Sequence, residues 1–161
     1  ADDFHPRHCD CRKTYEYDIL NRTFPLPAYR NTAYFLYGTL NIEAMRQACQ
    51  AFLGEHDFAS FCAAGAQVQT TARTIYSLEV ECRPLTEANA GSADQLLTIR
   101  VKGNGFLYNM VRIIAGTLVE VGRGHIKPEE VAGIIAVKDR AKAGPTAPAR
   151  GLRLVEIEYL Q

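Results

Sequence analysis

The sequence has no net charge, no long hydrophobic run and no internal repeat. Its 18 basic and 18 acidic residues cancel, so nothing attracts the whole molecule to nucleic acid or to a membrane, and any such binding must use local patches. The most apolar stretch, residues 107–121, is interrupted by Arg112 and Glu120 and is too short to span a bilayer. We also find no signal peptide or targeting segment.

The composition that is present is typical of one soluble globular domain. A chain of 161 residues is long enough to bury a core, and 47% apolar with 22% charged residues excludes a disordered or fibrous class. Five cysteines, an odd number, favour reduced thiols in a cytosolic protein over a disulfide framework. The expected localisation is therefore cytoplasmic.

Hydrophobic periodicity predicts an α+β fold, in which a mostly antiparallel mixed sheet has helices packed on it. Strands are expected where apolar residues alternate with polar ones, over 14–20, 76–82, 97–101 and 152–159. Helices are expected where apolar residues recur at helical spacing, over 42–53, over 107–121 with Gly122 closing it, and from Pro128 onward. Loops are expected between these elements, over 21–31, 54–61 and 138–150.

The helix predicted over 107–121 should be mostly buried, and this makes Arg112 informative. An unpaired buried cation costs several kcal/mol, so a carboxylate or a phosphate should face it. Ala115 and Gly116 share its strip of the helix and would let another backbone or a ligand approach closely. Two interpretations stay open: a structural ion pair or a guanidinium that reaches out to water, and an arginine that orients an active-site carboxylate or a bound phosphate.

Two other segments allow both a structural and a functional interpretation. Tyr15 and Tyr17 share one face of the first predicted strand, where they either pack in the core or form a wall against an unstacked nucleobase. The loop from Lys138 to Arg150 carries four cations and one acid. It is either a solvated linker or a segment that follows a nucleic-acid backbone.

Two candidate chemical sites have weak sequence patterns. The ligand types of a zinc site occur at His5, His8, Cys9 and Cys11, but the spacing is tight and no second ligand cluster follows, so a surface or strand-edge segment is favoured. His56 precedes Asp57, yet adjacent residues rarely face one another, which favours a surface histidine over a base and its orienting acid.

Several segments together resemble the TruA-type family of tRNA pseudouridine synthases. Their order and spacing match through almost the whole chain: Phe4–Arg7, Lys13–Tyr17, Leu53–Phe61, Gly103–Gly116, Lys138–Arg140 and Thr146–Leu154. The resemblance implies the fold of the pseudouridine synthase catalytic domain and an isomerase that needs no cofactor. Such an enzyme detaches uracil from its ribose, rotates it and rejoins it through carbon.

The resemblance also implies a substrate and site residues. Family members act on uridines on the 3′ side of the tRNA anticodon stem and loop, so tRNA is the expected partner, and the target base must leave the stack. Arg112 matches the arginine that pairs with a catalytic aspartate, Tyr15 the tyrosine against the base, and Leu152 the apolar residue on its other side. The remaining expected substrate contacts, including those to the RNA backbone, are Arg7, Phe106, Lys138 and Arg140. Pro6 departs from the small residue expected beside Arg7.

The family's nucleophile lies in an Arg-Thr-Asp motif that this sequence does not contain. Arg22-Thr23 leads into Phe24, and Arg73-Thr74 leads into Ile75. We therefore expect residues 1–161 to be the C-terminal domain of such an enzyme, homodimeric at full length, and inactive alone. A non-catalytic RNA-binding module and a small zinc-binding domain remain the alternatives. With the aspartate absent, we expect a sulfate, a phosphate or a substitute carboxylate near Arg112, or a loosened local structure.

Overall fold

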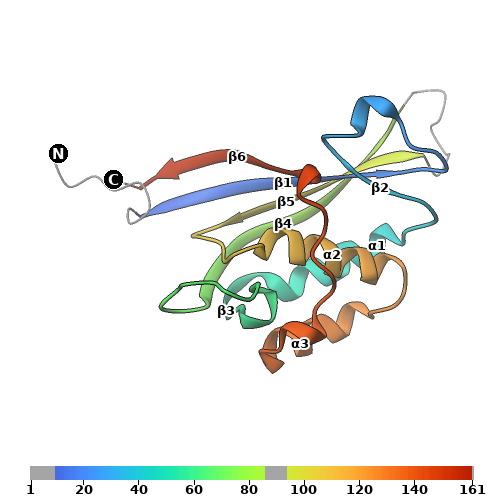
Figure 1. Cartoon of the computed structure of the whole chain (residues 1–161). Coiled ribbons are helices and arrows are strands. Elements are labelled where there is room, and N and C mark those ends of the chain that lie inside the picture. Colours follow the sequence, from blue (N-terminus) through green and yellow to red (C-terminus); the bar gives the residue numbers. More distant parts are fainter. Residues whose placement is uncertain (1–9, 86–93, 161) are drawn as a thin grey trace.

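A computed structural model describes residues 10–85 and 94–160. It contains one mixed sheet of six strands with three α-helices on one of its faces (Figure 1), which confirms the α+β fold. The strands are β1 (Cys11–Asn21), β2 (Tyr34–Leu36), β3 (Gly54–Asp57), β4 (Ala72–Pro84), β5 (Gln95–Gly103) and β6 (Leu152–Tyr159). The helices are α1 (Ile42–Cys49), α2 (Met110–Gly122) and α3 (Val131–Val137).

Strand β1 organises the sheet because it pairs with three other strands. The order is β2-β1-β5-β4-β3, and β6 pairs with the first part of β1 on the edge that β2 uses further along. Only the β1–β2 pair is parallel, so the sheet is mostly antiparallel as predicted. Alternation along β1 buries Tyr17 and Ile19 under the helices.

Helix α2 supplies the centre of the core between the sheet and α1. Every residue of α2 is buried except Arg112 and Glu120. The helix begins at Met110, three residues later than predicted, because Asn109 adopts a left-handed conformation with φ of 58°. The helix ends at Gly122, as predicted, and Arg123 is its cap. A Cβ at Gly122 would lie 2.8 Å from Met45 Sδ, so this glycine also allows α1 and α2 to pack closely.

The sequence did not predict the two shortest strands. Strand β2 lies beyond the expected loop, and β3 lies within the segment expected to be a loop. The three residues of β2 and four of β3 are too few to show an alternating pattern, and each strand pairs with one neighbour only. Within the described ranges, no helix is both long and apolar enough to cross a membrane.

Candidate active site

An open pocket of about 220 Å³ lies where β1, the β5–α2 connection, the first turn of α2 and the start of β6 meet. Four of the residues that the sequence singled out line it: Tyr15, Phe106, Arg112 and Leu152. They come from three separate segments of the chain, since Phe106 and Arg112 share the continuous stretch 106–112. Only the tertiary fold brings them together.

The turn after β5 aims Phe106 into the pocket. A Cβ at Gly103 would lie 2.9 Å from Thr74 O and 3.1 Å from the Phe106 ring, so the chain can pass here only as glycine. The Asn104 side chain accepts a hydrogen bond from Thr74 N at 2.8 Å, which fixes the turn to β4. The Phe106 ring then meets Tyr15 edge to face, with ring centroids 5.3 Å apart.

The basic loop after α3 docks directly on α2. A Cβ at Gly116 would overlap Pro145 O, and one at Gly144 would lie 2.6 Å from Thr117 Cα. Gly144 N also donates to Thr117 Oγ1 at 2.9 Å. Gly116 therefore lets another backbone approach α2 closely. The sequence analysis had allowed either a backbone or a ligand at this strip of the helix.

This docking determines the surroundings of Arg112. Its Nε donates to Ala147 O at 2.7 Å, and one Nη donates to Asn109 Oδ1 at 3.1 Å. Both acceptors are neutral, and none of the described residues forms an ion pair with this guanidinium. The side chain is half-buried and faces the pocket. The arrangement therefore holds a positive charge in a fixed place and leaves it available for an anion.

Two tyrosines of β1 differ in their environment. Tyr15 is half-buried, lines the pocket and has its pKa raised by burial, so its hydroxyl stays neutral at physiological pH. Tyr17 is fully buried, and its hydroxyl donates to Pro148 O at 2.6 Å. Burial, with a smaller contribution from Tyr34, raises the pKa of Tyr17. Tyr15 presents a ring to the pocket, while Tyr17 anchors the loop that precedes β6.

Gly151 controls how Leu152 enters the site. A Cβ at Gly151 would lie 2.7 Å from Tyr17 Cζ and 2.8 Å from Asp18 O. The chain can therefore cross over Tyr17 only because this residue is glycine. The next residue, Leu152, begins β6 opposite Tyr17 and is half-buried at the wall of the pocket.

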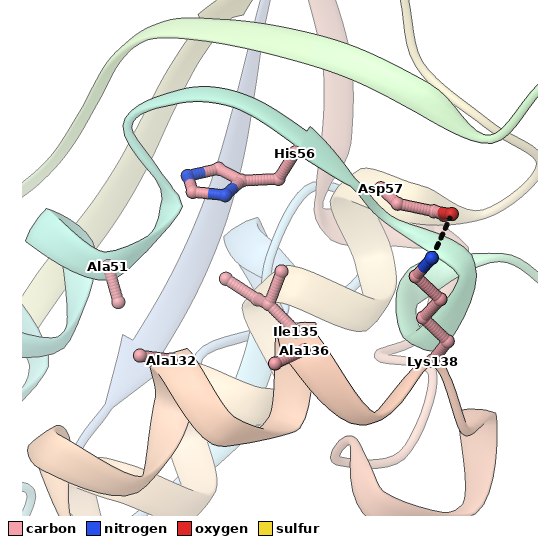
Figure 2. Close-up of a pocket in the computed structure, with 7 residues that line it drawn as sticks. All are labelled: Ala51, His56, Asp57, Ala132, Ile135, Ala136 and Lys138. Carbon is pink, nitrogen blue, oxygen red and sulfur yellow. Dashed lines mark ion pairs between the residues drawn. The ribbon is translucent and has the colours of Figure 1, made fainter.

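Lys138 and Arg140 do not line this pocket. The Lys138 Nζ lies 3.2 Å from Asp57 Oδ2 at the edge of another cavity, of about 180 Å³, between β3 and α3 (Figure 2). Arg140 donates to Gly144 O at 2.8 Å and to Thr146 Oγ1 at 3.1 Å. Arg140 thus holds the loop that carries Ala147, and its predicted contact with RNA stays a prediction.

His56 and Asp57 line the same cavity but do not act as a base and its orienting acid (Figure 2). His56 Nε2 is 2.8 Å from Leu53 O. Asp57 accepts instead from Thr71 Oγ1 at 2.5 Å and from Ala59 N at 3.1 Å. The hydrogen bond from Thr71, followed by contributions from Lys138 and Ala59, lowers the pKa of Asp57.

The remaining predicted site residues, namely the substrate contact Arg7 and the candidate zinc ligands, lie near the start of the chain. Arg7, His5, His8 and Cys9 lie outside the described residues, and Cys11 is the first residue of β1. Across residues 10–85 and 94–160, no three or more His, Cys, Asp or Glu side chains are grouped to hold a metal ion.

Sequence reasoning did not identify the two partners of Arg112. Asn109 belongs to a segment that carried the resemblance, but nothing in the pattern indicated its left-handed backbone or its contact with the guanidinium. Asparagine tolerates this conformation better than most residues, but Asn109 lies inside the apolar stretch 107–121, where the pattern predicted a helix. Ala147 contributes only a carbonyl oxygen, which no side-chain pattern reveals.

Comparisons with known proteins converge on one family. A family model described as tRNA pseudouridine synthase matches residues 48–160. The tRNA pseudouridine synthase A of Thermoanaerobacter sp. (strain X514) is 46% identical over 158 residues, covering 98% of this chain and 61% of the relative. That of Bacillus subtilis (strain 168) is 45% identical over 160 residues, covering 99% of this chain and 61% of the relative. The chain thus spans about 61% of the length of these relatives.

Proposed function

The chain belongs to the tRNA pseudouridine synthase family, and from this premise we propose that it forms one wall of an active site that isomerises uridine to pseudouridine in tRNA. One observation carries the proposal. The half-buried Arg112 has no acidic partner among the described residues and faces a pocket shared with Tyr15, Phe106 and Leu152. A fixed cation beside aromatic and aliphatic walls suits an acid and a planar base together.

The reaction requires a carboxylate that is held in place and walls that confine the detached base. The C1′–N1 bond of uridine breaks, the uracil rotates, and a C1′–C5 bond forms, while C5 loses a proton and N1 gains one. Arg112 would hold an ionised carboxylate at the reacting carbon, because a guanidinium lowers the pKa of a carboxyl beside it. Tyr15 and Leu152 would confine the detached base during rotation. The pocket is smaller than the roughly 300–1,000 Å³ of drug-sized sites, which suits a single base.

The reacting carboxylate would come from outside these 161 residues. The Arg-Thr-Asp pattern does not occur in the sequence. We therefore propose that the chain is the C-terminal portion of a synthase. As a separate proposal, this synthase acts in the cytoplasm as a homodimer. We expect the 161-residue chain alone to be inactive.

The decisive experiment measures pseudouridine formation in a tRNA transcript by the full-length protein that carries this chain. Arg112→Lys keeps the positive charge but loses the planar fork that pairs with a carboxylate, so we expect kcat to fall by at least ~100-fold. Arg46→Lys on α1 is the matched control. Turnover by Arg112→Lys at the wild-type rate would contradict the site. Tight tRNA binding by the wild type without any product would instead support the non-catalytic RNA-binding module.

A further inference from the structure

A second groove, of about 450 Å³, lies beside the end of β1 and β2, away from the pocket that contains Arg112. Its walls are apolar and include the half-buried rings of Tyr29 and Phe35 and the side chain of Leu26. Pro25 and Pro27 flank Leu26 and restrict the backbone that forms one wall. Arg30 and Arg150 stand at its border.

The charge at this groove is of one sign. Arg30 and Arg150 are both exposed, and no acidic residue lines the groove. Neither arginine forms an ion pair with another residue in the described part of the chain. An apolar groove bordered by two unpaired guanidinium groups is complementary to a ligand that has both an aromatic ring and a negative charge.

Arg150 is held in place. Its Nε donates to Ala33 O at 3.2 Å, and its guanidinium carbon lies 5.9 Å from the centre of the Tyr34 ring. These contacts fix the plane of the guanidinium and use only one of its nitrogens. The two Nη groups donate to no further protein partner within residues 10–85 and 94–160.

The groove and the candidate active site lie on opposite faces of the sheet, because Leu20 and Phe35 of the groove belong to an apolar cluster separate from that of Tyr15 and Leu152, and they approach each other at the sheet edge where Arg150 stands. Arg150 precedes the Gly151-Leu152 step that enters the active-site pocket. Arg112 and Arg150 both act electrostatically on the Tyr17 hydroxyl, which anchors this crossing by its bond to Pro148 O. In Figure 1 the short red turn before β6 lies beside β1, between β6 and β2. An RNA strand that passes around this edge could therefore reach both pockets.

We propose that this groove binds one unstacked nucleotide of the same RNA whose uridine occupies the Arg112 pocket. Its base would rest on the Tyr29 and Phe35 rings, and its phosphate would meet Arg30 and Arg150. This inference rests on the proposed function. A nucleotide suits the groove better than an aliphatic peptide because it supplies an aromatic ring and a negative charge together, whereas binding of a second copy of the chain is an outcome of the test below.

The test compares variants of the full-length protein in binding to a short single-stranded RNA and in turnover of tRNA. Tyr29→Leu keeps the apolar contact but removes the ring, and should weaken binding about tenfold. Arg30→Ala should weaken it severalfold and reduce the salt dependence by about one ion. Arg46→Ala on α1 is the matched control and should leave both unchanged. KM should rise in both groove variants while kcat stays within about twofold of wild type.

Folding is checked for each variant by thermal unfolding. If Tyr29→Leu is unstable, Arg30→Ala decides, because the exposed Arg30 side chain forms no hydrogen bond or ion pair with residues 10–85 and 94–160. Binding within twofold of wild type for Arg30→Ala and a folded Tyr29→Leu would overturn the inference while leaving the proposed function intact. A change in oligomeric state without a change in RNA binding would also overturn it and identify a subunit interface. Absence of pseudouridine in the wild-type reaction would instead overturn the proposed function and this inference with it.

Discussion

Arg112 donates its Nε hydrogen to the main-chain oxygen of Ala147, 2.7 Å away and 35 residues later in the chain. Ala147 N in turn donates to Arg112 O at 3.0 Å. This reciprocal pair couples the position of a charged side chain to the path of the loop between α3 and β6. The loop is therefore part of the candidate active site, although its charged side chains Lys138 and Arg140 do not line the pocket.

Sulfate should stabilise the 161-residue chain through Arg112. Because an anion that binds only the folded state raises the free energy of unfolding, sulfate at ten times its dissociation constant should add about 1.4 kcal/mol. Arg112→Met should lose this response, while the control Arg46→Met should keep it. Thermal unfolding at constant ionic strength, with chloride replaced by sulfate, measures the difference. An equal sulfate response in Arg112→Met would show that the anion binds elsewhere.

Gly116→Ala should destabilise the fold and detach the loop from α2. The added methyl group would overlap Pro145 O, which is backbone and cannot rotate away. We expect a loss of about 1–3 kcal/mol in the free energy of unfolding, as for overpacked cores, and a loss of the sulfate response because Ala147 moves with the loop. Denaturant titration followed by sulfate addition measures both.

Gly133→Ala is the control for this change. Gly133 lies in α3 and has open space where a Cβ would be. The substitution should stabilise the chain by roughly 0.5–1 kcal/mol, because alanine favours a helix more than glycine does. Equal stability of the two alanine variants would mean that the loop does not rest on Gly116.

The sequence predicted the residues that line the site better than the loop that holds them in place. Tyr15 and Leu152 lie on predicted strands and Arg112 on a predicted buried helix, and the family resemblance pointed to these three and to Phe106; the structure brings all four to one pocket. Their roles stay predictions. The path of the loop could not be predicted, since it depends on backbone contacts with Gly116 that only the folded molecule defines.

The predicted RNA contacts of Lys138 and Arg140 also show what the sequence alone could not reveal. A count of charges cannot distinguish a cation that faces solvent from one that holds its own loop. Arg140 donates to Gly144 O and Thr146 Oγ1, and Lys138 pairs with Asp57 from a left-handed backbone conformation. The local composition therefore predicted the charge of this segment, but not where its charged side chains point.

Asp57→Asn should lower stability near neutral pH and have less effect in acid. The folded-state pKa of Asp57 lies below its ordinary value of 3.8, chiefly because Thr71 donates to the carboxylate. A lowered pKa contributes stability that is fully present above the unfolded-state value and is lost as pH falls through the folded-state value. The variant and wild-type curves should therefore converge below about pH 4. Urea unfolding from pH 7 to pH 3 measures this.

Glu43→Gln is the control for the acid experiment. Glu43 is a largely exposed carboxylate on α1 whose ion pair with Arg46 spans 3.6 Å. Exposed pairs of this kind contribute little, so we expect a change within about 0.5 kcal/mol at pH 7. A pH-independent difference between Asp57→Asn and wild type would contradict the role of the Asp57 charge.

Tyr17→Phe should change how stability depends on alkaline pH. Burial raises the pKa of Tyr17 above its ordinary value of 10.0, so the neutral hydroxyl contributes stability that is complete below the unfolded-state pKa and falls as pH rises toward the folded-state value. Phenylalanine cannot ionise, so the variant should decline less steeply above pH 10.

At pH 7 the same variant should lose about 1 kcal/mol, because Pro148 O no longer receives the hydroxyl hydrogen. The two stability curves should therefore approach each other as pH rises, which urea unfolding between pH 7 and pH 11 measures. Tyr37→Phe is the control, since that side chain is 72% exposed and should leave the curve unchanged. An equally steep alkaline decline in wild type and Tyr17→Phe would show that this hydroxyl does not hold the crossing that brings Leu152 to the pocket.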